Sequence, residues 1–489
     1  MSESTQEGGG IGQAIGSLLL VLGGFMLIPA VADASEGNPD WKAFLLAAGI
    51  TLFAGVMLLA ATRDTAYESS PVRRAYFITV GAWVVLSLFG ALPFWFSSLH
   101  ISYCDAVFET ISGFTTTGST ILTGLDKMPA GVLLWRGLVQ WMGGVGIIVM
   151  AIAILPMFRV GGMQMFKLES SEKTNDKASP RVRSMAMRIF WVYNFLCLAC
   201  AVTYWGLGMT PFEAAIHSMT TLSTGGYSTS DESIGHFNSL SMQWAGTVFM
   251  LLGGMPFVLF VMAIGGKGPG ILLRDGQVRR MLATALISAL GMTAWLVWAN
   301  DFDPWVAFTQ SMFNLVSVMT TTGFVSTDYS LWGSLPVAAF FFMTFVGGCA
   351  GSTAGGLKMF RFDVLWQDIR KECRRLLYPH GVFPDLMAGR PVGPDLVRDV
   401  QVFVLCYAAA AAGLTVVLAC YGLDFMTAFS GAATALANVG PGLGAVIGPA
   451  GNFSSLPDGA KWALDAGMLL GRLEFETVFV MFTLQFWRD

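Results

Sequence analysis

Long runs of apolar residues, separated by polar stretches, recur along the whole chain. Ten of these runs are long enough to cross ~30 Å of hydrocarbon as helices that rise ~1.5 Å per residue. They lie at about 11–32, 42–62, 75–98, 131–156, 188–208, 240–264, 281–299, 335–357, 399–422 and 462–487. The pattern predicts an all-α polytopic membrane protein with about ten spanning helices.

Four shorter apolar segments lie between the later long ones, and each is followed by a loop rich in Thr, Ser and Gly. The segments lie at about 103–116, 211–223, 304–321 and 424–437. They are too short to span the bilayer, so we expect re-entrant half-helices. Their loops read GFTTTGST, TLSTGGYST, MTTTGFVST and LANVGPGLG. Non-helical backbone at membrane depth is tolerated only where protein or water surrounds it, so these loops are expected to line a cavity.

Composition supports a membrane protein and narrows its chemistry. Of the 489 residues, 54% are hydrophobic and only 12% are charged, whereas a typical soluble domain is about 25% charged. The net charge of −4 argues against a nucleic-acid partner. Cys197 and Cys200 form a C-x-x-C pair inside an apolar run, where we expect buried thiols rather than a zinc or redox site. No cluster of His, Cys and carboxylates has metal-ligand spacing, and we expect no organic cofactor on this chain.

Basic residues concentrate in alternate loops. Of the 28 Lys and Arg residues, 22 lie in 63–74, 159–188, 267–280 and 358–398. By the positive-inside rule these loops are cytoplasmic, which also places the N-terminus in the cytoplasm. No Lys or Arg precedes the apolar run 11–32, so we expect a retained helix there rather than a signal peptide. The opposite loops are acidic, which attracts cations, although ordinary solvated loops explain the acidity as well.

A repeat of about 100 residues organises the chain. Aligning the four loops places four glycines in register, 107, 98 and 117 residues apart: Gly118, Gly225, Gly323 and Gly440. A small-residue site follows each glycine after 24–31 residues, at Gly143-Gly144, Gly253-Gly254, Gly347-Gly348 and Gly471-Arg472. Each unit reads helix, half-helix, loop, helix. We predict an N-terminal helix pair and four pore repeats, at 1–70, 71–160, 181–266, 276–378 and 396–489.

Four such units around one axis predict a pore. The C-terminal ends of the half-helices carry partial negative charge, which favours a cation. Glycine-bearing loops can turn their carbonyl groups inward and replace the hydration shell of an ion. One Thr-Thr-Gly is ordinarily a loop at a helix end, but four in register favour a selectivity filter. The candidate ion-binding residues are Thr116, Thr117, Gly118, Ser223, Thr224, Gly225, Thr321, Thr322, Gly323, Asn438, Val439 and Gly440.

These loops, together with GGCAGSTAGGLK in the third unit, resemble those of the Trk/Ktr/HKT superfamily of potassium transporters, most closely the bacterial TrkH-type subunit. The resemblance covers nearly the whole chain, including the helix pair that precedes the repeats. It implies potassium uptake across the bacterial inner membrane, with K⁺ as the transported ion. It also implies a homodimer with one pore in each copy and a cytoplasmic nucleotide-binding partner ring of the TrkA type.

The resemblance also bears on the choice of ion. In this superfamily a serine in the first filter accompanies sodium permeability, so Gly118 implies a preference for potassium. The second loop, with Gly225-Gly226-Tyr227, and the fourth, with Asn438-Val439-Gly440-Pro441, depart from Thr-Thr-Gly. The fourfold symmetry is therefore expected to be approximate.

A glycine-dense stretch, GGCAGSTAGGLKMFR at 347–361, interrupts the apolar run 335–357. Gly351 to Gly356 match the spacing of a phosphate-binding loop, but Leu357 stands at the position of its lysine and no strand precedes it, so we reject nucleotide binding there. A flexible break below the filter matches the intramembrane gating loop of the superfamily. The candidate gate residues are Gly347, Gly348, Gly351, Ser352, Thr353, Gly355, Gly356 and Arg472.

Two arginines lie within apolar runs. Arg472 is eleventh in the helix predicted from Trp462, near the bilayer midplane, where a charge is costly and points to a function. We expect it to face the pore, repel cations and bind carbonyl groups of the gating loop. A charge pair with Glu476, one turn further on, is compatible with this role. Arg136 lies near the outer end of its helix, where we expect it to snorkel.

The segment 357–377, after the glycine stretch, is basic and amphipathic. Such segments usually lie on anionic lipid, and docking of a partner is the second interpretation.

A gated, passive potassium pathway is the function that these features favour. A potassium symporter coupled to H⁺ or Na⁺ is the alternative, and it should carry paired ionisable groups near the midplane. Arg472 and Glu476 are present, but the sequence reveals no carboxylate pair on different helices. A membrane-embedded enzyme is a remote alternative, because no catalytic constellation is apparent, and we predict that the chain is not an enzyme.

Overall fold

The computed structural model describes residues 10–63, 71–153, 179–381, 383, 386–387, 390–391 and 394–488. Within these residues the fold is built almost wholly of helices, which confirms the prediction of an all-α membrane protein. In the described part of the chain, seven helices are long and apolar enough to span a bilayer. They are α1 (Ile11–Ser35), α2 (Trp41–Ala61), α3 (Pro71–Gly90) continued by α4 (Leu92–Phe96), α6 (Ala130–Ala153), α9 (Ser179–Gly206), α14 (Gly276–Asn300) and α18 (Pro394–Cys420).

The remaining three expected spans are interrupted. The run 240–264 forms α11 (Leu240–Gly253) and α12 (Phe257–Met262), and the chain bends by 90° between them, next to Pro256. A short π-helix at Ala263–Lys267 and α13 (Gly270–Arg274) continue this unit. The run 335–357 is helical only as α16 (Ser334–Thr344), in agreement with the predicted interruption.

The last run, 462–487, differs from the expected single span. It is divided into α20 (Asp458–Arg472), α21 (Phe475–Met481) and α22 (Leu484–Arg488). The first break falls at Glu474, whose φ of +59° lies in the left-handed region that ends a helix.

Helices occur at all four of the short apolar segments: α5 (Tyr103–Phe114), α10 (Pro211–Leu222), α15 (Pro304–Met319) and α19 (Phe425–Ala437). Each begins at a residue whose side chain accepts a hydrogen bond from the first turn: Ser102, Thr210, Asp303 and Asp424. These caps fix where each half-helix starts, and the Thr/Ser/Gly-rich loop follows its C-terminal end.

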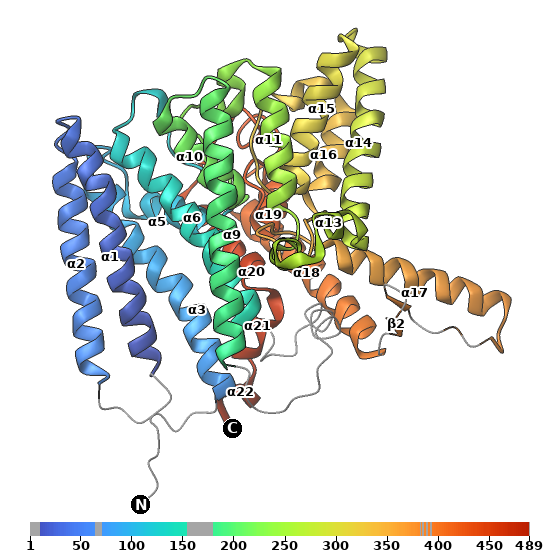
Figure 1. Ribbon diagram of the computed structural model, residues 1–489, viewed down its shortest axis with the longest axis horizontal. Helices are drawn as coiled ribbons and strands as arrows, with labels where there is room; N and C mark the ends of the chain where they lie inside the picture. The colour runs from blue at the N-terminus through green and yellow to red at the C-terminus, as the bar shows by residue number, and fades with distance from the viewer. Residues whose placement is uncertain are drawn as a thin grey trace, which may run out of the picture.

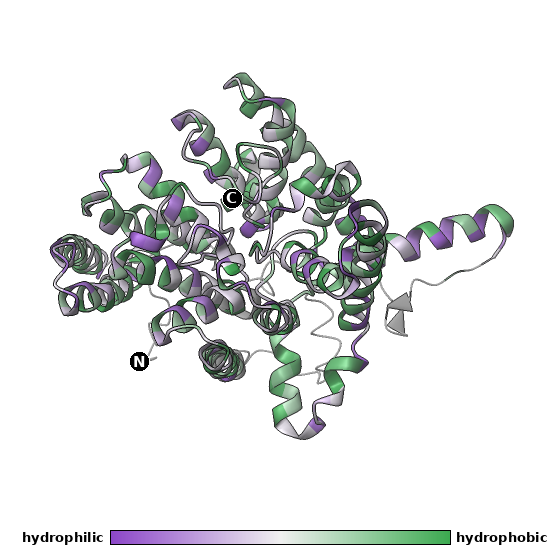
Figure 2. Ribbon diagram, turned by 90° about the horizontal axis from the view of Figure 1, so that it is seen from above, coloured by the Kyte–Doolittle hydropathy of each residue, from purple (hydrophilic) through white to green (hydrophobic). Residues whose placement is uncertain are grey.

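The helices form one broad bundle (Figure 1). The first two, α1 and α2, pack against each other at one edge, whereas α14 and α15 lie toward the opposite edge. A long helix, α17 (Met359–Leu377), extends away from the body, and its hydrophilic and hydrophobic residues alternate along it in Figure 2. The short elements are η1 (Leu125–Lys127), η2 (Ser233–Phe237), η4 (Tyr329–Trp332), β1 (Leu386–Met387) and β2 (Arg390–Pro391).

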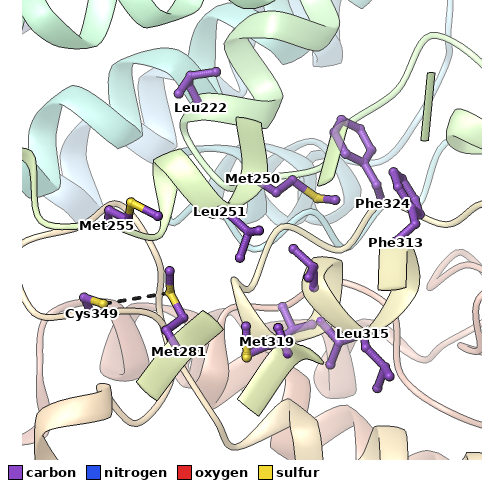
Figure 3. Close-up of a cluster of buried hydrophobic side chains, with 14 of the residues drawn as sticks. Leu222, Met250, Leu251, Met255, Met281, Phe313, Leu315, Met319, Phe324 and Cys349 are labelled. Atoms are coloured by element: carbon purple, nitrogen blue, oxygen red, sulfur yellow. Dashed lines mark hydrogen bonds between the residues drawn. The ribbon is translucent and has the colours of Figure 1, made fainter. Parts of the chain in front are cut away.

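A buried apolar cluster joins the second and third units beneath their loops. Figure 3 shows methionine, leucine and phenylalanine side chains of α10, α11, α14 and α15 meeting there. Cys349 of the glycine stretch joins this cluster, and its Sγ lies 3.8 Å from Sδ of Met281. Cys197 and Cys200 are buried free thiols, as the sequence predicts.

Candidate functional site

The four Thr/Ser/Gly-rich loops share one backbone pattern. A non-glycine residue with φ between +52° and +57° starts each pattern, and a glycine with φ between +73° and +113° follows two residues later. The pairs are Thr116 with Gly118, Thr224 with Gly226, Thr321 with Gly323, and Asn438 with Gly440. Left-handed backbone is rare for threonine, so its recurrence at three of these positions indicates a constrained conformation common to the loops.

This pattern corrects the alignment of the second loop. The sequence alignment places Gly225 opposite Gly118, but the left-handed glycine is Gly226. Hydrogen bonds agree, because the amides of Gly226 and Gly323 each donate to the carbonyl group six residues earlier, at Thr220 and Ser317. Two adjacent glycines cannot be told apart by composition, and their backbone angles decide the register.

The left-handed glycines connect the loops into a closed ring. A Cβ atom added to any one of them would overlap a backbone carbonyl oxygen of the next loop, and the fourth loop meets the first. The contacts are Gly118 with Gly225, Gly226 with Thr322, Gly323 with Val439, and Gly440 with Thr117. Glycine is therefore required at these positions both by the backbone angle and by the space.

Hydroxyl pairs brace the first and third loops. Oγ1 of Thr117 lies 2.7 Å from that of Thr115, and Oγ1 of Thr322 lies 2.9 Å from that of Thr320. The second and fourth loops are held by amides instead. Gln140 of α6 donates to the carbonyl group of Gly225, and Asn438 donates to Oγ1 of Thr117 and to the carbonyl group of Met468.

A buried ion pair supports the first two loops from behind. Nε of Arg136 in α6 lies 2.8 Å from Oε1 of Glu109 in α5, and Nη1 of Arg136 donates to the carbonyl group of Ser228. Glu109 also accepts from the amide of Ile121, and the Tyr227 hydroxyl donates to the backbone carbonyl of Glu109. Arg136 is only 1% exposed, so the expectation that it snorkels is wrong. A glutamate within the apolar segment 103–116 is the signal that sequence reasoning missed.

The glycine stretch after α16 forms an irregular loop that crosses beneath the ring. Oγ1 of Thr353 donates to the carbonyl group of Leu222, the last residue of α10, and to that of Gly253. The amide of Gly355 donates to Oγ1 of Thr321. A Cβ atom on Gly355 would overlap the carbonyl oxygen of Ala437, the last residue of α19. The loop therefore touches the inner ends of the second, third and fourth half-helices.

Arg472 reaches this loop from the end of α20. Its Nη1 donates to the carbonyl group of Thr353 at 2.9 Å, and the residue is 3% exposed. Its Nε and Nη2 have no hydrogen-bond partner within the described residues. The structure places Arg472 at the last position of a helix that begins at Asp458, rather than in the middle of a helix from Trp462.

Charged side chains surround the end of the loop that leads into α17. Nζ of Lys358 donates to the carbonyl group of Ala354. Arg361 pairs with Glu474 at 2.8 Å and stacks over the ring of Phe403. The side chain of Glu476, the predicted charge partner of Arg472, lies outside the described part of the chain.

A cavity lies against this loop. Its lining includes the loop residues 350–352 and 354–356, together with Ile147 and Met150 of α6 and Tyr407 of α18. Gly471 and Arg472 of α20 also line it. Elements of the first, third and fourth predicted repeats thus meet at this cavity.

Comparisons with known proteins agree with this geometry. Residues 42–488 match a family described as TrkH, cation transport protein. The Trk system potassium uptake protein TrkI of Halomonas elongata is 45% identical over 96% of this chain and 95% of that protein. The potassium uptake protein TrkH of Vibrio parahaemolyticus is 36% identical over 97% of this chain and 98% of that protein. A crystal structure of the potassium transporter TrkH from Vibrio parahaemolyticus superimposes with a TM-score of 0.90 at 34% identity, over 98% of this chain and 99% of that one.

Proposed function

Because this chain belongs to the TrkH family of cation transport proteins, we propose that it takes up potassium through a pore whose selectivity filter is the ring of four loops. The family consists of membrane transport proteins and not of enzymes. One observation carries the proposal: the closed contact of each left-handed glycine with a carbonyl group of the next loop. Backbone carbonyls arranged around one axis can replace the hydration shell of a potassium ion.

The corrected alignment assigns the ring to twelve residues in four triplets. Three triplets are those expected from the sequence, namely Thr116–Gly118, Thr321–Gly323 and Asn438–Gly440. In the second loop we propose Thr224, Gly225 and Gly226, while Ser223 keeps the adjacent position that Thr115 holds in the first loop. One triplet lies in each of the four pore repeats that we propose, at 71–160, 181–266, 276–378 and 396–489.

We propose that residues 347–356 gate this pore. Contacts of Thr353 and Gly355 with the ends of the half-helices support a position across the pathway. Arg472 adds a positive charge at the same level, so a cation that passes meets both a steric and an electrostatic barrier.

Proton-coupled uptake is the second candidate, and one buried group favours it. Asp465 of α20 is 2% exposed, and neither of its carboxylate oxygens has a hydrogen-bond partner within the described residues. Lys461 lies one turn earlier on α20, and its Nζ forms an ion pair with Oδ1 of Asp105 at 2.6 Å. Such a carboxyl group inside a membrane protein is a natural place for a proton. Sequence reasoning did not find Asp465.

Purified protein in liposomes separates the two functions. A passive pathway lets K⁺ run only down its own electrochemical gradient, at a rate that an imposed pH gradient leaves unchanged. A coupled carrier accumulates K⁺ against its gradient when protons flow inward, and Asp465→Asn should abolish that accumulation. Equal fluxes of K⁺ and Na⁺ through the wild-type protein would contradict the filter itself.

We further propose the assembly and location that the family resemblance implies. The chain would lie in the bacterial inner membrane with its N-terminus in the cytoplasm, as a homodimer bound to a nucleotide-binding ring of the TrkA type. The exposed end of α17, with Arg374 and Arg375 in its last turn, offers a basic surface to that partner. Most of the other candidate surface, 159–188, lies outside the described residues. Charge reversal at both arginines should weaken co-purification of the ring, and survival of the complex in high salt would rule this surface out.

A further inference from the structure

Gln140 connects a spanning helix directly to the filter. It lies on α6, is fully buried, and its Nε2 donates to the carbonyl oxygen of Gly225 at 2.6 Å. Its Oε1 accepts from the backbone amide of Tyr227 at 3.1 Å. An amide nitrogen can only donate, so the Tyr227 contact fixes the orientation of the side-chain amide and identifies Nε2 as the donor to Gly225.

The second loop needs this support because it lacks a side chain that two other loops have. The residue before the left-handed glycine is Thr117 in the first loop and Thr322 in the third, and each forms a hydroxyl pair within its own loop. The corresponding residue of the second loop is Gly225. A Cβ atom there would overlap the side-chain amide of Gln140, so the glutamine occupies the space of the missing threonine.

No other unit repeats this arrangement within the described residues. Counting three residues back from each small-residue site gives Gln140, Met250, Thr344 and Met468. The hydroxyl of Thr344 bonds within its own helix, and Met468 supplies only a backbone carbonyl to Asn438. In the part of the chain that the structure describes, only the second loop receives a hydrogen bond from a side chain of a spanning helix to a ring carbonyl.

We propose that Gln140 is a specificity-determining residue that positions the Gly225 carbonyl in the ring. This inference rests on the proposed filter. One lone pair of that oxygen is occupied by the amide, so the oxygen stays at a fixed distance from the pore axis and cannot move inward around a smaller ion. Loss of the amide would free the second loop, and the ring would then accept Na⁺ more readily.

Removing the side chain of Gln140 and adding a threonine side chain at Gly225 tests the proposal. Gln140→Ala should lower the K⁺/Na⁺ permeability ratio about five- to tenfold, as expected for one buried hydrogen bond of ~1–1.5 kcal/mol. Adding Gly225→Thr to that variant places a threonine two residues after Ser223, as Thr117 stands two residues after Thr115, and should restore most of the ratio. Gly225→Thr alone should impair it, because Gln140 still fills the space. Reversal potentials of the reconstituted protein measure all three ratios.

Gln243→Ala is the matched control. Gln243 is a buried glutamine on α11, and within the described residues its side chain makes no hydrogen bond to a filter loop. This variant should keep the wild-type ratio while removing a comparable buried side chain. Stabilisation against heat by K⁺ but not by Na⁺ reports the filter separately from folding. Gln140→Ala should reduce that difference and Gln243→Ala should not.

A wild-type ratio in Gln140→Ala, when Gly118→Ser lowers the ratio in the same assay, overturns this proposal and leaves the filter standing. If neither variant changes the ratio, the filter proposal fails as well. If Gln140→Ala does not fold, the double variant decides: a folded, K⁺-selective double variant supports the exchange of roles, and a non-selective one contradicts it.

Discussion

The proposed filter ring and the proposed gating loop are both glycine-rich, irregular backbone, but different contacts hold them in place. Each filter loop is fixed by its own half-helix, by its left-handed residues and by the neighbouring loop. The loop 347–356 is held by contacts with other elements. Its backbone forms hydrogen bonds with Gly253, Gly254 and Phe257. The side chains of Thr353, Thr321 and Arg472 add further bonds between the loop and its neighbours. We therefore expect the proposed filter to keep one shape, and the proposed gate to leave its place when its contacts with neighbouring elements break. Selectivity and closure should therefore be separable by mutation.

Removal of the Arg472 charge should give the largest effect. At ~4 Å and an effective dielectric constant of ~20, two unit charges repel by about 4 kcal/mol, so Arg472→Ala should increase K⁺ flux by up to a thousandfold. The K⁺/Na⁺ ratio should stay unchanged, because the ring is untouched. Uptake of ⁸⁶Rb⁺ into proteoliposomes that contain this subunit alone measures the flux.

Arg472→Lys separates charge from shape. Lysine keeps the positive charge but loses the guanidinium bond to Thr353. A flux close to wild type in the lysine variant and a high flux in the alanine variant would assign the barrier to charge. Wild-type flux in both folded variants would show that Arg472 contributes nothing to the barrier.

A variant in the ring should have the converse effect, a change in ion selectivity without opening of the gate. Gly118→Ser introduces a side chain that overlaps the Gly225 carbonyl, at a residue with φ of +87°. Strain of ~1–2 kcal/mol at such a position should lower the K⁺/Na⁺ ratio about tenfold, without opening the gate. Gly124→Ser is the matched control, because Gly124 has φ of +75° but open space around it. Equal ratios for the two variants would mean that the first loop does not select the ion.

Much of this arrangement follows from the sequence, because apolar length and small residues are local signals. The short helices α5, α10, α15 and α19 and the break after α16 fall where they are predicted. The bend before α12 had a signal in Pro256, which lacks an amide hydrogen, whereas the break at Glu474 involves neither glycine nor proline.

What the sequence could not supply are pairings between distant residues. The sequence predicted that Arg136 snorkels, because its partner Glu109 lies on another helix and the pairing is visible only in the structure. The choice between Gly225 and Gly226 required backbone angles, and the role of Gln140 required the space left by Gly225. A polar residue in an apolar helix indicates that it has a partner, but the sequence does not identify that partner.

A smaller change in the gating loop should raise flux moderately. Thr353→Val removes the hydroxyl whose single hydrogen is shared between carbonyl groups of α10 and α11. The loop should therefore open more often, and K⁺ flux should rise about fivefold to tenfold with an unchanged K⁺/Na⁺ ratio. Ser352→Ala is the control, because among the described residues the Ser352 hydroxyl donates only to the carbonyl group of Cys349, in the same loop. If both variants raise flux equally, the attachment of Thr353 is not what keeps the loop in place.

The smallest expected effect lies beyond the loop, in the helix that follows it. Asp363 of α17 forms an ion pair with Arg280 of α14, yet burial raises the pKa of the Asp363 carboxyl to about 6, against the opposing effect of Arg280. The folded protein therefore holds this proton more tightly than the unfolded chain, and stability should fall as pH rises from about 4 to about 6, then level off. In Asp363→Asn the unfolding temperature should change less with pH than in the wild type, by a few degrees at most. The K⁺/Na⁺ ratio should stay unchanged. Thermal unfolding of the detergent-solubilised protein between pH 4.5 and 7 measures it. A variant with the wild-type pH profile would exclude Asp363 as its source, and a variant with altered selectivity would contradict the separation of ring from gate.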